Sequence, residues 1–175
     1  MSVLEIVRYP HPTLAKRCKE VEAVNDEVKT LVQDMIDTMY EANGIGLAAC
    51  QVGVSQRIIV VDVSPMDSEQ HLFVLLNPEL LEEEGEVESE EGCLSVPDCV
   101  EKVSRKKKVR VKGLSVEGKE IEVSGEGILA IALQHEIDHL NGVLILDHIS
   151  RLKREIYRDK VKKEKKKEKE KEKSD

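Results

Sequence analysis

Apolar residues recur at helical spacing in three parts of the chain. In residues 25–44 they come every three or four positions, which predicts an amphipathic helix with Asn25 as its N-cap. Residues 126–141 are apolar nearly all round, as in a helix buried on every side. A third helix is predicted from about residue 148 through Tyr157 into the Lys/Glu-rich end of the chain.

The middle of the chain has the patterns of strands. The apolar run 58–63 predicts a buried strand, and the stretch 71–92 predicts a second strand, then a turn and an acidic connection toward Cys93. Residues 103–125 alternate like a half-buried hairpin that turns at residues 117–119. The sequence therefore predicts an α+β fold, with antiparallel β-sheets around a buried central helix and a further helix toward each end of the chain.

Composition and charge divide the chain in two. Its 175 residues, 40% of them apolar, suit a single domain with a substantial core. Residues 1–150 hold 14 Lys and Arg against 28 Asp and Glu, whereas residues 151–175 hold 13 against 7. We expect one catalytic domain over 1–150 and a basic helix or tail over 151–175. That tail could contact a polyanion such as RNA, although a solvated helix is the plainer interpretation.

The sequence has neither a basic, apolar leader at its start nor an apolar run of the ~20 residues that cross a bilayer. We therefore expect a cytoplasmic protein that does not enter the membrane. In that compartment its four cysteines are expected to be free thiols or metal ligands rather than disulfides.

The stretch QHEIDHLNG lies in the buried helix predicted over residues 126–141. It places His135 and His139 four residues apart, on one face of the helix, with Glu136 between them. Two imidazoles and a carboxylate need a reason to be buried, and a metal ion supplies one. A catalytic centre of the zinc type has three protein ligands and one open position, so a third ligand has to come from elsewhere in the chain.

Three sources for the third ligand can be considered, two of which come from protease families that use HExxH. In a metzincin protease a third histidine would fall at Ile145, so this chain lacks it. A thermolysin-like protease takes a glutamate from a later helix, where the chain offers mainly Glu155 and the charged tail. Upstream, Cys93 lies in EGCLSVP, and its thiolate would complete a Cys-His-His set. Spacing alone leaves Cys93 equally balanced between ligand and packing residue.

Three separated segments together resemble one family. GIGLAACQVG (44–53), EGCLSVP (91–97) and QHEIDHLNG (134–142) are similar to the signature segments of bacterial peptide deformylases, in the same order and at similar separations. The resemblance covers residues 3–155. It implies a hydrolase that removes the formyl group from the N-terminal formyl-methionine of nascent chains and releases formate.

The resemblance also implies roles for particular residues. Cys93, His135 and His139 would be the metal ligands, and Glu136 the catalytic acid and base. The side chain of Gln51 and the backbone N–H of Leu94 would donate to the developing oxyanion. Main-chain pairing at Ile45 and Gly46 would hold the peptide as an added strand. Ile45 would also line an apolar methionine pocket, together with the remaining candidates: Ile128, Ile131 and Ala132.

The metal and the partners follow from the same resemblance. It implies Fe²⁺ in the cell, while sulfur beside two imidazoles also suits Ni²⁺, Co²⁺ or Zn²⁺ in purified protein. The partners would be formylated nascent peptides, with the C-terminal helix docking on the ribosome, and the enzyme would be a monomer. Cys50, Ser89 and Val100 depart from residues that relatives carry, which bears on redox sensitivity and substrate preference.

Two other functional classes remain open at this stage. HExxH also fits a zinc endopeptidase that cleaves internal peptide bonds. The basic tail also fits a non-catalytic factor bound to the ribosome or RNA, in which the metal site is only structural. The presence of Glu136 favours an enzyme, because a closed structural site needs no base beside it.

Overall fold

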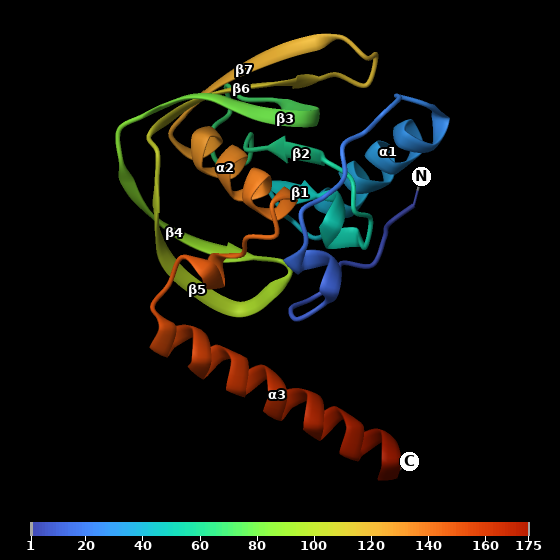
Figure 1. Cartoon of the computed structure of the whole chain (residues 1–175), viewed down its shortest axis with the longest axis vertical. Coiled ribbons are helices and arrows are strands. Elements are labelled where there is room, and N and C mark those ends of the chain that lie inside the picture. The colour runs from blue at the N-terminus through green and yellow to red at the C-terminus, as the bar shows by residue number, and fades with distance from the viewer. Residues whose placement is uncertain (1, 175) are drawn as a thin grey trace.

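The computed structural model describes residues 2–174. Three α-helices and seven strands make up most of it, with one α-helix before the strands along the chain and two after them (Figure 1). The helices are α1 (Asp26–Glu41), α2 (Ile128–Leu140) and α3 (Arg151–Ser174), and the short 3₁₀ helices are η1 (Pro12–Ala15), η2 (Ala49–Val52) and η3 (Ile145–Asp147). The strands are β1 (Gly46–Ala48), β2 (Ile58–Asp62), β3 (Leu72–Glu84), β4 (Val87–Cys93), β5 (Val96–Arg105), β6 (Lys108–Leu114) and β7 (Glu120–Glu126).

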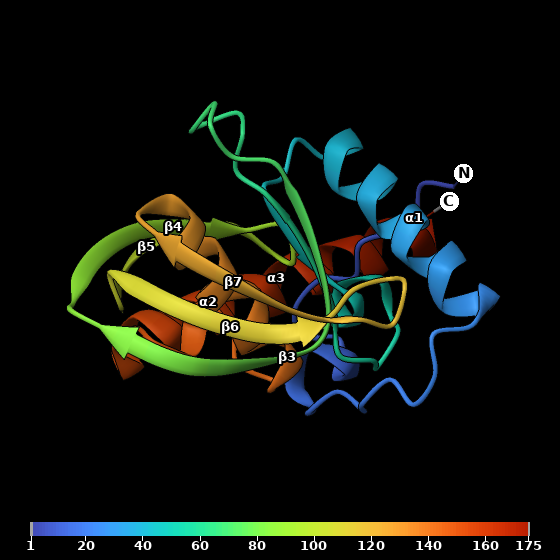
Figure 2. The ribbon, with the colours of Figure 1, turned by 90° about the horizontal axis from the view of Figure 1, so that it is seen from above.

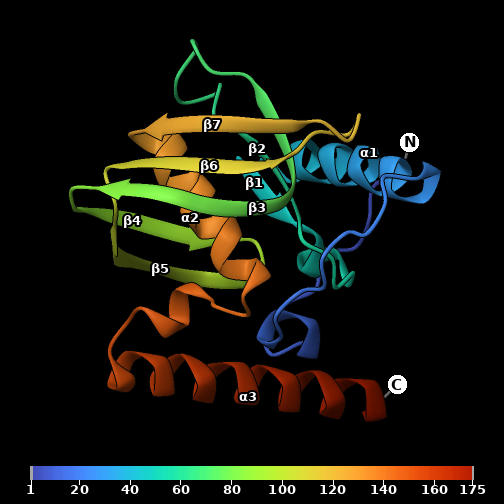
Figure 3. The same cartoon turned by 45° about the horizontal axis from the view of Figure 1, so that its top comes forward.

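The strands form two antiparallel sheets. One has five strands in the order β1-β2-β3-β6-β7, and the other is the β4-β5 hairpin. Helix α2 lies between the two sheets, and α1 flanks the end of the larger sheet near β1 and β2 (Figures 2 and 3). This is the α+β arrangement that the sequence predicted, with the HExxH helix at its centre.

The core has two parts, one on each side of the larger sheet. Side chains of α2 pack between the two sheets, and side chains of α1 pack against β1 and β2. Strand β2 is buried at all five of its positions because helices contact it from both of these parts. A strand covered on both faces reads as a continuous apolar run, which is why residues 58–63 lack the alternation of a half-buried strand.

Several predicted elements are confirmed. Asn25 caps α1, since its side-chain oxygen accepts a hydrogen bond from the N–H of Val28 at 3.0 Å. Strands β6 and β7 form the predicted hairpin, in register from Lys108 opposite Glu126 to Leu114 opposite Glu120, although residues 103–105 at its expected start belong to β5. Helix α2 falls within two residues of the predicted bounds.

The prediction of an acidic connection before Cys93 was wrong, because this part of the chain forms strands. Strand β3 runs on to Glu84, and β4 occupies Val87–Cys93. The glutamates of β3 are exposed, and Glu82 pairs across the ladder with Arg110 of β6 at 2.7 Å. Basic side chains on the neighbouring strand offset the charge repulsion that made this stretch look like a loop.

Helix α3 begins three residues later than predicted, because η3 precedes it. It runs along the side of the β4-β5 hairpin that faces away from α2 (Figure 3). Tyr157 and Val161 pack against the core, whereas Leu152 and Ile156 are exposed. Between residues 2 and 174, no helix has the length and apolar character needed to cross a membrane.

Candidate functional site

Helix α2 brings its two histidines together at the centre of the molecule. Nε2 of His135 and Nε2 of His139 lie 3.2 Å apart, as expected for side chains one helical turn apart. Burial holds the pKa of His139 well below its usual range, so its imidazole is neutral and carries a free lone pair. The Nε2 atoms of the two rings lie close to the same point.

The turn between β4 and β5 places a thiol at that point. Sγ of Cys93 lies 3.3 Å from Nε2 of His139, and the three potential ligand atoms all lie within 4.8 Å of one another. Cys93 pairs with Val96 across the tight end of the hairpin, after a register shift that separates it from the regular ladder. The irregular end of the hairpin thus aims Cys93 at α2 rather than along the sheet.

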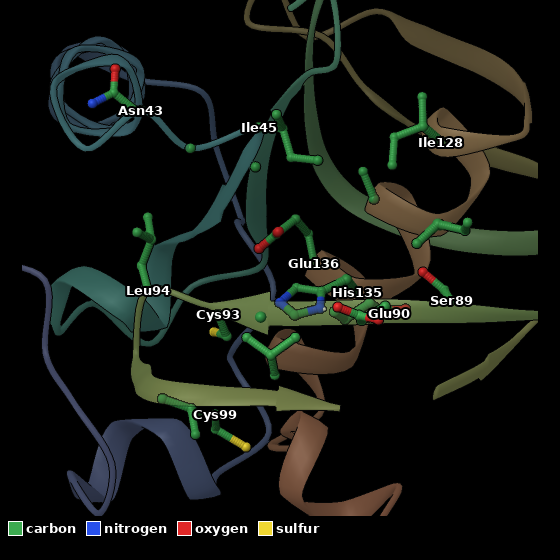
Figure 4. Close-up of a pocket in the computed structure, with 18 of the residues that line it drawn as sticks. Asn43, Ile45, Ser89, Glu90, Cys93, Leu94, Cys99, Ile128, His135 and Glu136 are labelled. Atoms are coloured by element: carbon green, nitrogen blue, oxygen red, sulfur yellow. Dashed lines mark hydrogen bonds and ion pairs between the residues drawn. The ribbon is translucent and has the colours of Figure 1, made fainter. Parts of the chain in front are cut away.

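Glu136 lies beside the cluster and is itself buried, with 5% of its surface exposed. Its carboxylate lies between Ile45 on one side and His135 and Cys93 on the other (Figure 4). Burial raises the pKa of Glu136 to about 7, and Oε1 has no hydrogen-bond partner among the described residues. A buried carboxyl group with a pKa near neutrality is suited to taking up and releasing a proton.

Gln51 approaches the cluster from η2. Its Oε1 accepts a hydrogen bond from the N–H of Ala48 at 2.9 Å, which fixes the direction of the amide. Its Nε2 then points at the turn, 3.2 Å from Oγ of Ser95 and 3.7 Å from Sγ of Cys93. Leu94 follows Cys93 in the same turn, so the Gln51 amide and the Leu94 backbone border the same space.

A cavity of about 460 Å³ opens over these groups. It is lined by residues from β1, the β4-β5 hairpin and the first turns of α2. Every site residue predicted from the sequence lines it except His139, which lies beneath His135 with 1% of its surface exposed. The predicted lining residues are Ile45, Gly46, Gln51, Cys93, Leu94, Ile128, Ile131, Ala132, His135 and Glu136.

Both the sequence and the fold of this chain are similar to those of known proteins. The model of the polypeptide deformylase family matches residues 3–155. The chain is 54% identical over 162 residues to a peptide deformylase of Thermodesulfovibrio yellowstonii, covering 93% of this chain and 98% of that protein. The chain belongs to the polypeptide deformylase family.

Solved deformylase structures have the same fold. That of Legionella pneumophila is 46% identical and superposes with a TM-score of 0.87, over 95% of this chain and 98% of the other. That of Ehrlichia chaffeensis in complex with actinonin is 40% identical, with a TM-score of 0.89 over 94% and 98%. The protein is accordingly a metal-dependent enzyme that removes formyl groups from nascent peptides. The endopeptidase and the non-catalytic interpretations of the sequence are not supported.

The cluster formed by Cys93, His135 and His139 fits a divalent metal ion. One sulfur and two imidazole nitrogens are donors that soft and borderline metals prefer, and three such atoms leave a position open. Nδ1 of His135 lies 3.0 Å from Oε1 of Glu91, a contact typical of a metal-binding histidine whose other nitrogen carries the proton. His135 therefore also has the carboxylate partner that a metal-binding histidine commonly has.

Glu91 belongs to a buried network that the sequence analysis missed. Arg105 donates to both oxygens of Glu91, at 2.9 and 2.7 Å, and also to Asp138 at 2.5 Å. Burial alone would raise the pKa of Glu91, but the hydrogen bonds from Arg105 and His135 outweigh it and lower that pKa to about 2. Glu91 is thus a fixed negative charge behind His135. Its place two residues before Cys93 was the only signal in the sequence.

The three departures from the deformylase pattern lie in or near the site. Ser89 and Val100 line the mouth of the cavity, and Val100 is exposed. Cys50 is fully buried, and its thiol donates to the backbone carbonyl of His139 at 3.3 Å. Cys50 is therefore a small packing residue against helix α2.

Proposed function

We propose that Cys93, His135 and His139 bind one divalent metal ion and that Glu136 moves the proton in deformylation. The convergence of Sγ and two Nε2 atoms beside a buried, unpartnered carboxylate is the observation that carries this proposal. When bound, such an ion supplies an activated water and polarises a carbonyl oxygen. We further propose that the ion is Fe²⁺ in the cell, and that Ni²⁺, Co²⁺ or Zn²⁺ can occupy the site in purified protein.

Glu136 serves both halves of the reaction in this proposal. Its carboxylate accepts a proton from the attacking water, whose oxygen forms a bond to the formyl carbon. Protonated Glu136 then delivers that proton to the peptide nitrogen as the carbon–nitrogen bond breaks, which gives formate and a free amine. Burial raises the pKa of Glu136, which favours its protonated form between the two steps.

Gln51 and Leu94 act on the oxygen of the formyl group. Charge builds on this oxygen as the carbon becomes tetrahedral, and hydrogen bonds from the Gln51 amide and the Leu94 backbone N–H stabilise it. Removing one such donor typically costs ~2.7–4 kcal/mol in the barrier. The hydrogen bond that Ala48 donates to Gln51 holds the amide in place before the reaction begins.

The substrate is held through its backbone and its first side chain. Strand β1 is an edge strand of its sheet, so the main chain at Ile45 and Gly46 can pair with an extended peptide. Pairing of this kind accepts any sequence, as an enzyme acting on many nascent chains requires. We place the methionine side chain against Ile128, Ile131 and Ala132, which form the apolar wall of the cavity.

Formate release from formyl-Met-Ala-Ser by protein purified without air tests these roles. We expect Glu136→Ala to lose at least a hundredfold in kcat while it keeps its metal. Glu88→Gln, which removes an exposed carboxylate on β4, should match wild type. Equal rates for wild type and Glu136→Ala would refute the role of Glu136. Metal analysis of the same preparation tests the assignment of iron.

The C-terminal part of the chain belongs to the same proposal. We propose that residues 1–150 form the catalytic domain of a cytoplasmic monomer, and that 151–175 form a basic appendage that docks on the ribosome. Residues 151–175 carry a net charge of +6, against −14 for the rest. A variant that ends at Val161 should release formate from the tripeptide normally but co-sediment less with ribosomes at low salt. Unchanged co-sedimentation would contradict the docking.

A further inference from the structure

The turn that carries Cys93 and Leu94 is held from outside its own hairpin. Two carbonyl groups just after Leu94, those of Ser95 and Pro97, accept hydrogen bonds from distant parts of the chain. Ser95 is fully buried. The position of the Leu94 N–H is therefore set partly by whatever holds these two carbonyls.

The N-terminal segment provides the first of these contacts. The N–H of Tyr9 donates to the Ser95 carbonyl at 2.7 Å, and the N–H of Val7 donates to the Gln51 carbonyl at 2.7 Å. In an extended segment, N–H groups two residues apart point the same way. Residues 7–9 thus tie η2, which carries Gln51, to the turn that carries Leu94.

Helix α3 provides the second contact. The hydroxyl of Tyr157 donates to the Pro97 carbonyl at 2.7 Å, and the tyrosine is buried, with 8% of its surface exposed. Burial, and then the nearby acidic groups, raise the pKa of Tyr157 to about 12, so the hydroxyl remains a donor at neutral pH.

Tyr9 links this contact to the N-terminal segment. The Tyr9 ring centroid lies 6.0 Å from that of Tyr157, and Nε of Arg158 donates to the Tyr9 hydroxyl at 3.2 Å. Tyr9 of the N-terminal segment and the part of α3 around Tyr157 therefore meet near the turn, where α3 passes the N-terminal segment (Figure 3).

We propose that Tyr157 is a positioning residue, which holds the Pro97 carbonyl and so fixes the Leu94 N–H relative to the Gln51 amide. This inference rests on the proposed function, in which these two groups are the oxyanion donors. An oxyanion hole works only when its donors are in place before charge develops. Loss of one fixing hydrogen bond should therefore lower kcat and kcat/KM equally and leave KM unchanged.

The test compares Tyr157→Phe with Tyr9→Phe in protein loaded with equal metal. Both changes remove one hydroxyl at the same interface, but the Tyr9 hydroxyl contacts Arg158 and not the turn. We expect kcat for formyl-Met-Ala-Ser to fall about fivefold in Tyr157→Phe and to stay at the wild-type value in Tyr9→Phe. Amide hydrogen exchange of residues 93–96 should be faster in Tyr157→Phe alone.

Other outcomes would overturn the inference. An unchanged kcat in Tyr157→Phe, an equal fall in both variants, or a rise in KM alone would each show that Tyr157 does not place the donors. Gln51→Ala and the double variant with Tyr157→Phe complete a cycle, in which the two effects should be less than additive. Wild-type kcat in Gln51→Ala would instead refute the oxyanion role of Gln51 in the proposed function, and this inference with it.

Discussion

Gly46 and Glu136 pack so closely that no side chain fits between them. A methyl group on Gly46 would lie 2.5 Å from Oε2 of Glu136 and 2.9 Å from its Cγ and Cδ. Gly46 has an ordinary backbone conformation, with a negative φ. The glycine is therefore required for the approach of strand β1 to the carboxylate rather than for a turn.

Gly46→Ala should therefore lower kcat/KM for a formylated tripeptide by about a hundredfold, because it displaces Glu136, and a shift of about 1 Å can cost that much. Steady-state formate release would measure the loss. Gly92→Ala is the matched control, since its methyl group meets only ordinary contacts at 3.6 Å. A Gly46→Ala enzyme with normal rates would mean that Glu136 does not act from this position.

Glu91→Gln should loosen the metal. The substitution keeps the shape of the side chain but removes the charge that faces Nδ1 of His135, and it leaves Arg105 with a weaker partner. We expect the metal to be lost to a chelator between about ten and a hundred times faster. Metal release followed with a chromophoric chelator would measure this. Glu90→Gln, an exposed neighbour, is the control, and equal release from both variants would contradict the role of Glu91.

The hydrogen bond between Tyr40 and Asp62 should stabilise the protein only within a pH window. Burial would raise the pKa of Asp62, but hydrogen bonds from Ser64 and Tyr40 lower it below its usual 3.8. Burial and the Asp62 carboxylate raise the pKa of Tyr40 from 10.0 to about 12. The contribution of a carboxyl group with a lowered pKa is lost as the pH falls below 3.8. That of a phenol with a raised pKa is lost as the pH rises from 10.0 toward 12.

Tyr40→Phe measures that window. Because Tyr40 is 46% exposed, we expect the variant to lose only about 0.5–1 kcal/mol in free energy of unfolding between pH 5 and pH 9. The difference from wild type should shrink below about pH 4 and above about pH 10. Urea unfolding followed by circular dichroism at each pH would show this. A difference that does not vary with pH would exclude the charged hydrogen bond as its cause.

Gly142→Ala should destabilise the whole fold. Gly142 has a φ of +73°, and a methyl group there would lie 2.8 Å from both the carbonyl carbon and oxygen of Ala15. The backbone conformation alone costs a residue other than glycine about 1–2 kcal/mol, and the clash adds to it. We expect a loss of about 3 kcal/mol in urea unfolding. Gly118 also has a positive φ, but a methyl group there would have nothing within 4 Å. Gly118→Ala therefore separates backbone strain from steric clash and should lose less free energy of unfolding.

Part of the site could be predicted from local spacing. His135, Glu136 and His139 lie on one helix, so their geometry follows from the helical repeat. Cys93 is 42 residues away from His135, and only the resemblance of three segments to a family singled it out. The Glu91–Arg105–Asp138 network joins two strands and a helix, and its residues have no shared spacing. No local pattern could have shown it.

The fold was predictable where the hydrophobic pattern was simple. The buried helix and the β6-β7 hairpin each carry one periodicity, and both were found. The acidic strands were missed because Glu82 and its neighbours depend on partners such as Arg110, which lies 28 residues away. Backbone pairing of β3 with β6 decided the conformation there, and intrinsic strand propensity did not.

The two edge strands of the larger sheet, β1 and β7, differ in how readily another extended chain could pair with them. Strand β1 is three residues long and uncharged, and it borders the cavity, whereas β7 carries Glu120, Glu122 and Glu126 along its length. These three glutamates pair with Lys112, Arg110 and Lys108 of β6, and charged side chains along an edge strand discourage another strand from pairing with it. In the proposed function, the β1 edge thus remains available to the peptide substrate at high protein concentration, while the long β7 edge resists aggregation.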